Sequence, residues 1–189
     1  NEDGETGTLM NDAAGYLDGT AYMVHRIDKQ TSGAVIIAKD PVVVPILDRL
    51  ISTGRIHRQY LAVVEGELRG HGQWRWPIGD DPTDPWRRQV NGVNAQTAVT
   101  NYQTIATGHG HTLVRLILAT GRTHQLRVHL AHSGHPIVGD PIYNPQSPAE
   151  MLLHADRQQL VVPFTMQNLV VQAPLPDYFT QTLVEYNLE

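Results

Sequence analysis

Apolar residues in this chain alternate with polar ones over several segments, at the period of two that is typical of half-buried β-strands. The clearest segment covers residues 56–65, where Arg58 and Tyr60 would share one face and Leu61 would lie on the other. Six further segments of strand character, bounded by turn residues, cover residues 33–38, 73–78, 95–106, 111–119, 152–162 and 168–173. The pattern predicts a chain rich in antiparallel strand pairs.

Helix signals are fewer and shorter. Asp40 and Pro41 are typical of a helix start, and an apolar stripe at helical spacing follows them as far as Gly54. A second helix is predicted over residues 123–133, because two leucines stand one turn apart ahead of a Gly-x-Pro stop. Weaker patterns indicate short helices within residues 8–17 and 177–186. Antiparallel strands with a few short helices predict a mixed domain of the α+β class.

The composition restricts the class of protein. At 189 residues the chain is expected to form one domain with a substantial core. It contains no cysteine, which excludes a disulfide framework, thiolate metal sites and a thiol nucleophile. No apolar run approaches the ~20 residues that span a membrane, and the acidic start is unlike a signal peptide. We therefore expect a soluble, cytoplasmic and monomeric protein.

The net charge of −5 is unusual for a protein that binds nucleic acid, which ordinarily carries a basic surface. Five acidic residues among the first twenty account for it, namely Glu2, Asp3, Glu5, Asp12 and Asp18. The remainder of the chain is neutral, and twelve of its fourteen basic residues are arginines, which form bidentate contacts with phosphate. This distribution predicts a local basic cleft on a neutral body.

Two polar clusters interrupt the predicted strands. The first covers residues 23–33 and concentrates Arg26, Asp28 and Lys29 just before a segment of strand character. By itself it fits either a hairpin loop whose Asp28 caps its own backbone or a catalytic loop. The second covers residues 121–141 and is rich in Arg, His and Gly.

Together, the two clusters resemble the RluA-type family of RNA pseudouridine synthases. Residues 57–66 and 151–155 continue the likeness in the family's order, so that it spans about residues 22–176. The resemblance implies a pseudouridine synthase fold, in which short helices flank a bent, largely antiparallel sheet with the active cleft across its middle. It also implies a catalytic domain over residues 22–189, preceded by an acidic segment, residues 1–21, that belongs to a truncated domain start.

The resemblance further implies an activity and a role for individual residues. Such enzymes isomerise specific uridines to pseudouridine in structured ribosomal or transfer RNA stem-loops, and the reaction needs no cofactor. Asp28 would be the catalytic carboxylate, attacking either the sugar or the base, and Arg127 its ion-pair partner. Tyr60 would stack on the uracil and is a candidate to take the proton from C5, while Arg26 would fill the space left by the flipped nucleotide. Other side chains expected to contact RNA are Lys29, Arg58, Arg122 and His124.

Other interpretations stay open. Four histidines within twelve residues, His124, His129, His132 and His135, are compatible with a metal-dependent hydrolase that also uses Asp28 or Asp140. The His-Glu-x-x-His spacing is missing, however, and the family motif accounts for three of these histidines, so no metal is expected. A non-catalytic RNA-binding protein of the same fold is disfavoured, because Asp28, Tyr60 and Arg127 are all present.

Several candidates also have an ordinary structural reading. Tyr60 could be a core aromatic residue, Arg127 a solvated helix charge and Asp140 a plain turn residue. Residues 70–95 are rich in turn signals and predict, after the strand at 73–78, an exposed loop that carries Trp86, Arg87 and Arg88. Such a loop is either a solvated excursion or an arm that contacts RNA.

Overall fold

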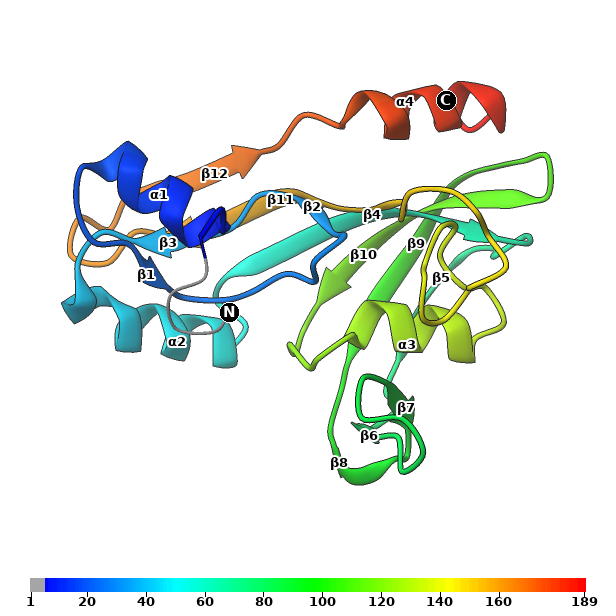
Figure 1. Cartoon of the computed structure of the whole chain (residues 1–189), viewed down its shortest axis with the longest axis horizontal. Coiled ribbons are helices and arrows are strands. Elements are labelled where there is room, and N and C mark those ends of the chain that lie inside the picture. The colour runs from blue at the N-terminus through cyan, green and yellow to red at the C-terminus, as the bar shows by residue number, and fades with distance from the viewer. Residues whose placement is uncertain (1–5) are drawn as a thin grey trace.

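The centre of the molecule is a sheet whose strands follow the order β12-β11-β4-β10-β9-β5 (Figure 1). The chain is described here from a computed structural model over residues 6–189. The strands of this path are β4 (His57–Glu65), β5 (His71–Trp74), β9 (Thr100–Gly108), β10 (His111–Leu118), β11 (Leu153–Val161) and β12 (Asn168–Gln172). Neighbours along this order pair antiparallel, while the short β2 (Ser32–Gly33) pairs parallel with β11. The predicted α+β class with a largely antiparallel sheet is confirmed.

Strand β4 runs through the middle of this sheet and has the predicted alternation. Tyr60, Ala62 and Val64 are buried in one hydrophobic cluster, whereas Leu61 and Val63 belong to a second cluster on the opposite face. Because each face of β4 packs against one of these clusters, residues 61–64 are all apolar. A core on each face of the sheet requires a covering element on each face.

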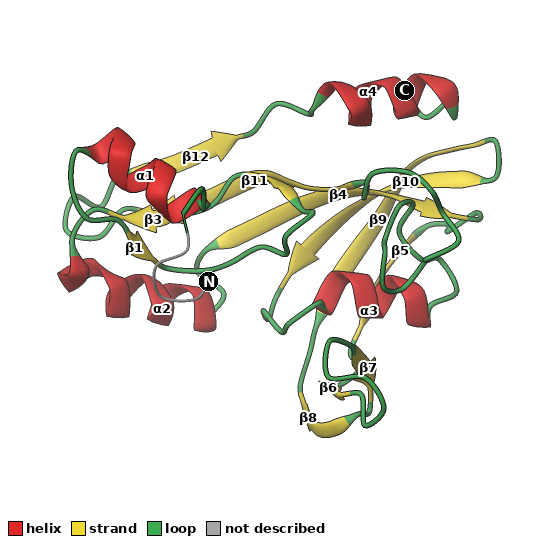
Figure 2. Ribbon diagram, viewed as in Figure 1, coloured by secondary structure: helices red, strands yellow, loops and turns green. Residues whose placement is uncertain are grey.

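The covering elements are helices α3 (Gln125–His132) and α4 (Asp177–Glu185). Leu126 and Leu130 of α3 pack into the cluster of Tyr60, while Phe179 of α4 packs into the other. Figure 2 shows the two helices on opposite sides of the sheet. Both helices were predicted close to these bounds, because their apolar spacing and stop signals are local.

The N-terminal part contains α1 (Leu9–Leu17), which Thr8 caps through Asn11, and the strand pair β1 (Tyr22–Met23) and β3 (Ile37–Ala38). A 3₁₀ turn (Pro41–Val43) leads into α2 (Val44–Ser52), and Asp40 caps this turn as predicted. Most of the acidic residues of the expected 1–21 segment lie in residues 1–5, which fall outside the described residues.

The prediction of one strand over residues 33–38 is wrong. The segment instead divides between β2, which pairs with β11, and β3, which pairs with β1. Gly33 has a φ of +108°, and a Cβ there would collide with the backbone of Ala155. The backbone therefore leaves the extended conformation at Gly33, so the six residues cannot follow one ladder.

Residues 78–96 form a separate small sheet of β6 (Ile78–Asp80), β7 (Arg88–Val90) and β8 (Val93–Gln96). The predicted strands 73–78 and 95–106 are each wrong in extent, because each is divided between this sheet and the central one. Trp86 is 80% exposed in the loop from β6 to β7, as predicted, but Arg88 lies in a strand and pairs with Asp80. Among residues 6–189, no helix is both long and apolar enough to cross a membrane.

Candidate active site

Asp28 lies in the loop between β1 and β2, which local hydrogen bonds hold in shape. The Thr31 amide donates to the Asp28 carbonyl at 2.9 Å and closes a turn around it. The Ile36 amide donates to Nε2 of His25 at 3.0 Å and ties the start of the loop to the segment between β2 and β3. The acceptor role requires the His25 ring to be neutral, and burial together with Arg58 lowers its pKa to about 4. These hydrogen bonds constrain the loop and therefore the position of the Asp28 carboxylate.

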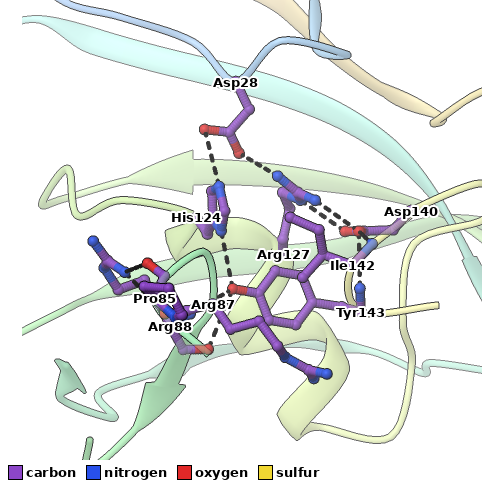
Figure 3. Close-up of polar contacts among 9 residues, drawn as sticks. All are labelled: Asp28, Pro85, Arg87, Arg88, His124, Arg127, Asp140, Ile142 and Tyr143. Carbon is purple, nitrogen blue, oxygen red and sulfur yellow. Dashed lines mark hydrogen bonds and ion pairs between the residues drawn. The ribbon is translucent and has the colours of Figure 1, made fainter. Parts of the chain in front are cut away.

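Arg127 of α3 is the immediate partner of that carboxylate. Its Nη1 donates to Asp28 Oδ2 at 3.1 Å (Figure 3). The Arg127 side chain is 2% exposed and that of Asp28 19% exposed, so solvent screens this ion pair only weakly. Arg127 is therefore not the solvated helix charge that a lone arginine on a helix usually is. Two segments about one hundred residues apart meet at this contact.

Asp140 completes the arrangement from the other side of Arg127. Its two carboxylate oxygens accept from Arg127 Nε at 2.8 Å and Nη2 at 2.7 Å, a bidentate contact in a fully buried position. Burial would raise the pKa of Asp140, but hydrogen bonds from Arg127 and from the Tyr143 and Ile142 amides hold it below its usual value. The reading of Asp140 as a plain turn residue is incomplete: its backbone turns, and its side chain fixes Arg127.

His124 and Tyr143 form a second support for the same centre. His124 Nε2 lies 4.0 Å from Asp28 Oδ1, and His124 Nδ1 lies 3.0 Å from the Tyr143 hydroxyl. The Tyr143 ring lies 5.2 Å from the Arg127 guanidinium, as a cation–π contact. Burial lowers the pKa of His124 despite the opposing charge of Asp28, so its ring is neutral near pH 7. Among the described residues, the full positive charge within ion-pair distance of Asp28 is that of Arg127.

Tyr60 on β4 is 4% exposed and lines the same small cavity as Asp28, of about 60 Å³. Burial raises the pKa of Tyr60 above its usual value although the charge of Arg58 opposes the shift, so the phenol is neutral. The cavity is lined by Arg26, Ile27, Asp28, Thr31, Tyr60, Leu118, Arg122, His124, Gln125, Leu126, Arg127 and Leu153. The three residues expected to be catalytic thus meet at one cavity.

Gln125 fixes the start of α3, which carries Arg127. Its Oε1 accepts from the Arg122 amide at 3.0 Å and from the Thr120 hydroxyl at 2.8 Å. Its Nε2 donates to the carbonyl of Val99 and to the hydroxyl of Thr100, both at 3.0 Å. One buried amide therefore ties the helix start to the beginning of β9 in the central sheet. This role was not predicted, because nothing local distinguishes Gln125 from a surface glutamine.

The side chains expected to contact RNA are distributed around this cavity. Arg26 and Arg122 are exposed residues, and both line it together with His124. Arg58 is only 5% exposed, so it is not part of an open surface; it lines an adjoining cavity of about 390 Å³. Lys29 is exposed on the Asp28 loop and lies outside both cavities.

The histidine cluster is dispersed in the fold. His129 is buried between the Thr100 hydroxyl and the Trp76 carbonyl, each at 3.0 Å, while His135 contacts the carbonyl of Glu65 at 2.9 Å. Nowhere in residues 6–189 do three His, Cys, Asp or Glu side chains gather in a way that could hold a metal ion. His129 and His135 thus serve packing and backbone contacts, whereas His124 lies at the site beside Asp28.

Comparison with known proteins agrees with this geometry. A sequence model described as RNA pseudouridylate synthase matches residues 3–132. The uncharacterized RNA pseudouridine synthase YhcT of Bacillus subtilis is 42% identical over 186 residues, which cover 93% of this chain and 61% of that protein. The chain belongs to the RNA pseudouridylate synthase family.

Other members of the RNA pseudouridylate synthase family are similar over the same region. Ribosomal large subunit pseudouridine synthase D of Xanthomonas campestris is 33% identical over 208 residues, covering 93% of this chain and 62% of that protein. The structure of Human RNA Pseudouridylate Synthase Domain Containing 1 superposes with a TM-score of 0.78 at 28% identity, covering 89% of this chain and 74% of that chain. The chain spans about three fifths of the length of these two bacterial relatives.

Proposed function

We propose that this protein isomerises specific uridines in RNA to pseudouridine, with Asp28 as the catalytic carboxylate. The observation that carries the proposal is the contact at 3.1 Å between Asp28 and the buried Arg127, at a cavity that Tyr60 also lines. A partly exposed carboxylate held by a buried, doubly paired arginine is a preorganised negative charge facing a cavity. Membership in the RNA pseudouridylate synthase family supports the same reaction.

The reaction breaks the bond between the sugar C1′ and uracil N1 and forms one between C1′ and C5. The C5 proton leaves and N1 gains a proton, so the sum of atoms and electrons is unchanged and no cofactor is required. Asp28 would act as nucleophile or as electrostatic partner while the glycosidic bond breaks. Arg127 would keep the carboxylate aimed into the cavity throughout.

Tyr60 would position the uracil by stacking. Its raised pKa favours the neutral phenol, which is a poor base, so we assign it to orientation of the ring and not to removal of the C5 proton. Arg26 and Arg122, exposed at the cavity, would hold the RNA strand and the space that the flipped base leaves. Lys29, Arg58 and His124 complete the set of side chains proposed to contact RNA.

Ribosomal RNA is the proposed substrate class, with transfer RNA as the alternative. Several similar bacterial proteins carry the name ribosomal large subunit pseudouridine synthase D. A uridine in a single-stranded loop is favoured over one in a duplex, because an unpaired base is extruded at lower cost. The proposed catalytic domain covers residues 22–189, with 1–21 as a preceding segment. It would act in the cytoplasm as a monomer, since one chain supplies Asp28, Tyr60 and Arg127.

The test is a map of pseudouridine positions in total RNA from cells that lack this gene. Loss of one or a few sites is expected, in ribosomal RNA for the favoured substrate, with restoration by the wild type and not by Asp28→Asn. Asp48→Asn, an exposed substitution on α2, is the matched control and should restore every lost site. If no position changes, and the purified protein also leaves unmodified ribosomal and transfer RNA transcripts unaltered, the proposed function is wrong.

A further inference from the structure

Arg58 is a buried cation that lacks a counter-ion in the part of the chain that the structure describes. The residue is 5% exposed, and its Nε has no hydrogen-bond partner. The ion pairs found among residues 6–189 join other side chains. Arg127 is buried to the same degree but is satisfied by two carboxylates. A guanidinium stays protonated when buried, so the charge of Arg58 is left unmatched.

The surroundings of Arg58 offer it polar contacts and no opposite charge of its own. It lines the cavity of about 390 Å³ together with the hydroxyl-bearing Ser52, Thr120 and Thr123. His25 also lines the cavity, but its pKa of about 4 makes the ring neutral. Asp28 reaches the cavity as well, and its carboxylate is held by Arg127.

Gly121 shows that the chain leaves room for the guanidinium at this point. A Cβ on Gly121 would stand 2.9 Å from Arg58 Nη1, which is closer than ordinary contact allows. Glycine therefore lets the guanidinium lie directly against the backbone that leads into α3. Arg58 and Gly121 both line this cavity, so the buried charge and the space for it belong to the same site.

Burying an unpaired charge is costly, and the cost is recovered when a ligand brings the opposite charge. The planar fork of an arginine matches the two unesterified oxygens of a phosphodiester. The cavity shares Arg26, Asp28 and Tyr60 with the smaller one, so a phosphate bound by Arg58 would lie beside the nucleotide held at Asp28. RNA supplies such a phosphate on each side of every nucleotide.

We propose that Arg58 is the binding site for one phosphodiester that flanks the flipped uridine. The inference rests on the proposed function and specifies how the substrate is held. Once the glycosidic bond breaks, the uracil must turn while the ribose keeps its place. A phosphate fixed by Arg58 would anchor the ribose through the backbone, leaving the base free to rotate.

The test is a chemical double-mutant cycle on a short stem-loop that contains the target uridine. Each phosphodiester near the uridine is replaced in turn by a neutral methylphosphonate, and the dissociation constant is measured for the wild type and for Arg58→Gln. In the wild type, one linkage next to the uridine should weaken binding by about 10- to 100-fold when neutralised. In Arg58→Gln the same replacement should have little further effect, while other linkages should behave alike in both proteins.

Two further variants distinguish the effect of losing the Arg58 charge from the effect of a folding defect. Arg157→Gln removes an exposed arginine from β11 and should reproduce the wild-type profile. Gly121→Ala keeps the charge of Arg58 but displaces the guanidinium, so it should weaken the same linkage effect. It also serves as the test if Arg58→Gln fails to fold in a thermal melt.

The outcomes are distinct. An RNA that the wild type converts normally, but whose linkages show no coupling to Arg58 or Gly121, overturns this inference and leaves the proposed function intact. A wild-type protein that converts no uridine in any ribosomal or transfer RNA transcript overturns both.

Discussion

At the scale of single residues, the centre of the site is an arginine between two carboxylates. Arg127 donates hydrogen bonds from Nε and Nη2 to Asp140 and from Nη1 to Asp28. The fully buried Asp140 holds the guanidinium in one orientation, and the guanidinium then holds the more exposed Asp28. Asp140 thus acts on Asp28 through Arg127 as a positioning residue.

Replacing Asp140 with Asn should therefore disturb catalysis from a distance. The variant loses one charge of a buried pair, and we expect a free energy of unfolding lower by about 3 kcal/mol. We also expect kcat to fall by about 10- to 100-fold with little change in the dissociation constant for RNA, because the phosphate-binding side chains are untouched. Denaturant titration and single-turnover assays measure the two effects, with Asp48→Asn as control. Wild-type kcat in a folded Asp140→Asn protein would contradict the positioning role.

His25 makes a separate prediction about pH. Its pKa is about 4 in the folded protein and about 6.5 in the unfolded chain, so the unfolded chain binds more protons between these values. The stabilising contribution is fully present above about pH 6.5 and is lost as the pH falls towards 4. Between pH 7 and pH 5 the free energy of unfolding should drop by about 2 kcal/mol on this account.

The measurement compares the wild type with His25→Gln by denaturant titration across that range. The amide keeps an acceptor for the Ile36 amide but does not titrate. The variant should show a pH slope smaller than that of the wild type by the His25 contribution. Equal slopes for the two proteins would show that His25 titrates alike in the folded and unfolded chains.

The contact between Asp28 and Arg127 could be expected from the sequence, because two motifs that match one family lie on a loop and on a short helix. Asp140, Tyr143 and Gln125 could not be assigned in this way. Their roles depend on contacts across the fold, such as the 3.0 Å distance from His124 to the Tyr143 hydroxyl. Arg58 was expected to contact RNA, but its burial could not be predicted, because strand alternation gives the face of a side chain and not its depth.

At the scale of elements, the position of the Asp28 loop depends on how β2 meets β11. The two strands pair in parallel for two residues, His154 with Ser32 and Ala155 with Gly33. The register of β11 against β4 shifts between His154 and Arg157, which is the same place. Strand β12 pairs with β11 only from Arg157 to Val161, so residues 154 and 155 of β11 keep a free edge to which the end of the loop is attached.

Gly33→Ala should therefore be unusually destabilising for an exposed glycine. Its φ of +108° is unfavourable for alanine, and the added methyl group would meet the backbone of Ala155, which cannot move freely. We expect a loss of about 2–4 kcal/mol of unfolding free energy. Gly70 is the control, because it also has positive φ (+79°) but no atom within 4 Å of its Cβ position, so Gly70→Ala should cost about 1 kcal/mol. Similar costs at both positions would show that Gly33 is not needed for the approach to β11.

The sequence predicted helices and strands well where a whole segment with one hydrophobic pattern belongs to one structural element. The strands β4, β10, β11 and β12 and the helices α1, α3 and α4 lie within a few residues of the predicted ranges. The failures lie at residues 33–38 and 73–106, where the chain passes from one sheet to another. The residues on both sides of such a transition have strand character, so periodicity alone gives no boundary.

At the scale of the whole molecule, the charge is uneven. The chain has a net charge of −5, yet the cavities at Asp28 are lined by Arg26, Arg58 and Arg122, with Lys29 on the same loop. Three arginines at these cavities, with Lys29 on the loop beside them, favour a short segment of RNA backbone over the wrapping of a long duplex.

The salt dependence of RNA binding measures the number of these contacts. With four phosphates neutralised on a single-stranded loop, the logarithm of the association constant should fall with the logarithm of salt concentration with a slope of about −3. Arg58→Gln should reduce the magnitude of the slope by about 0.7. A slope near zero would mean that the cleft does not bind phosphates, and a slope far steeper would point to a broader surface.

The most direct test of the account is the reaction itself, followed by the release of tritium from RNA labelled at C5 of uridine. Formation of the new bond from C1′ to C5 expels this hydrogen, so release counts each conversion. The purified wild-type protein should release the label from its target uridine, whereas Asp28→Asn should bind the same RNA with similar affinity and release none. Asp48→Asn should match the wild type. Normal release by a folded Asp28→Asn protein would contradict the assignment of Asp28 as the catalytic carboxylate.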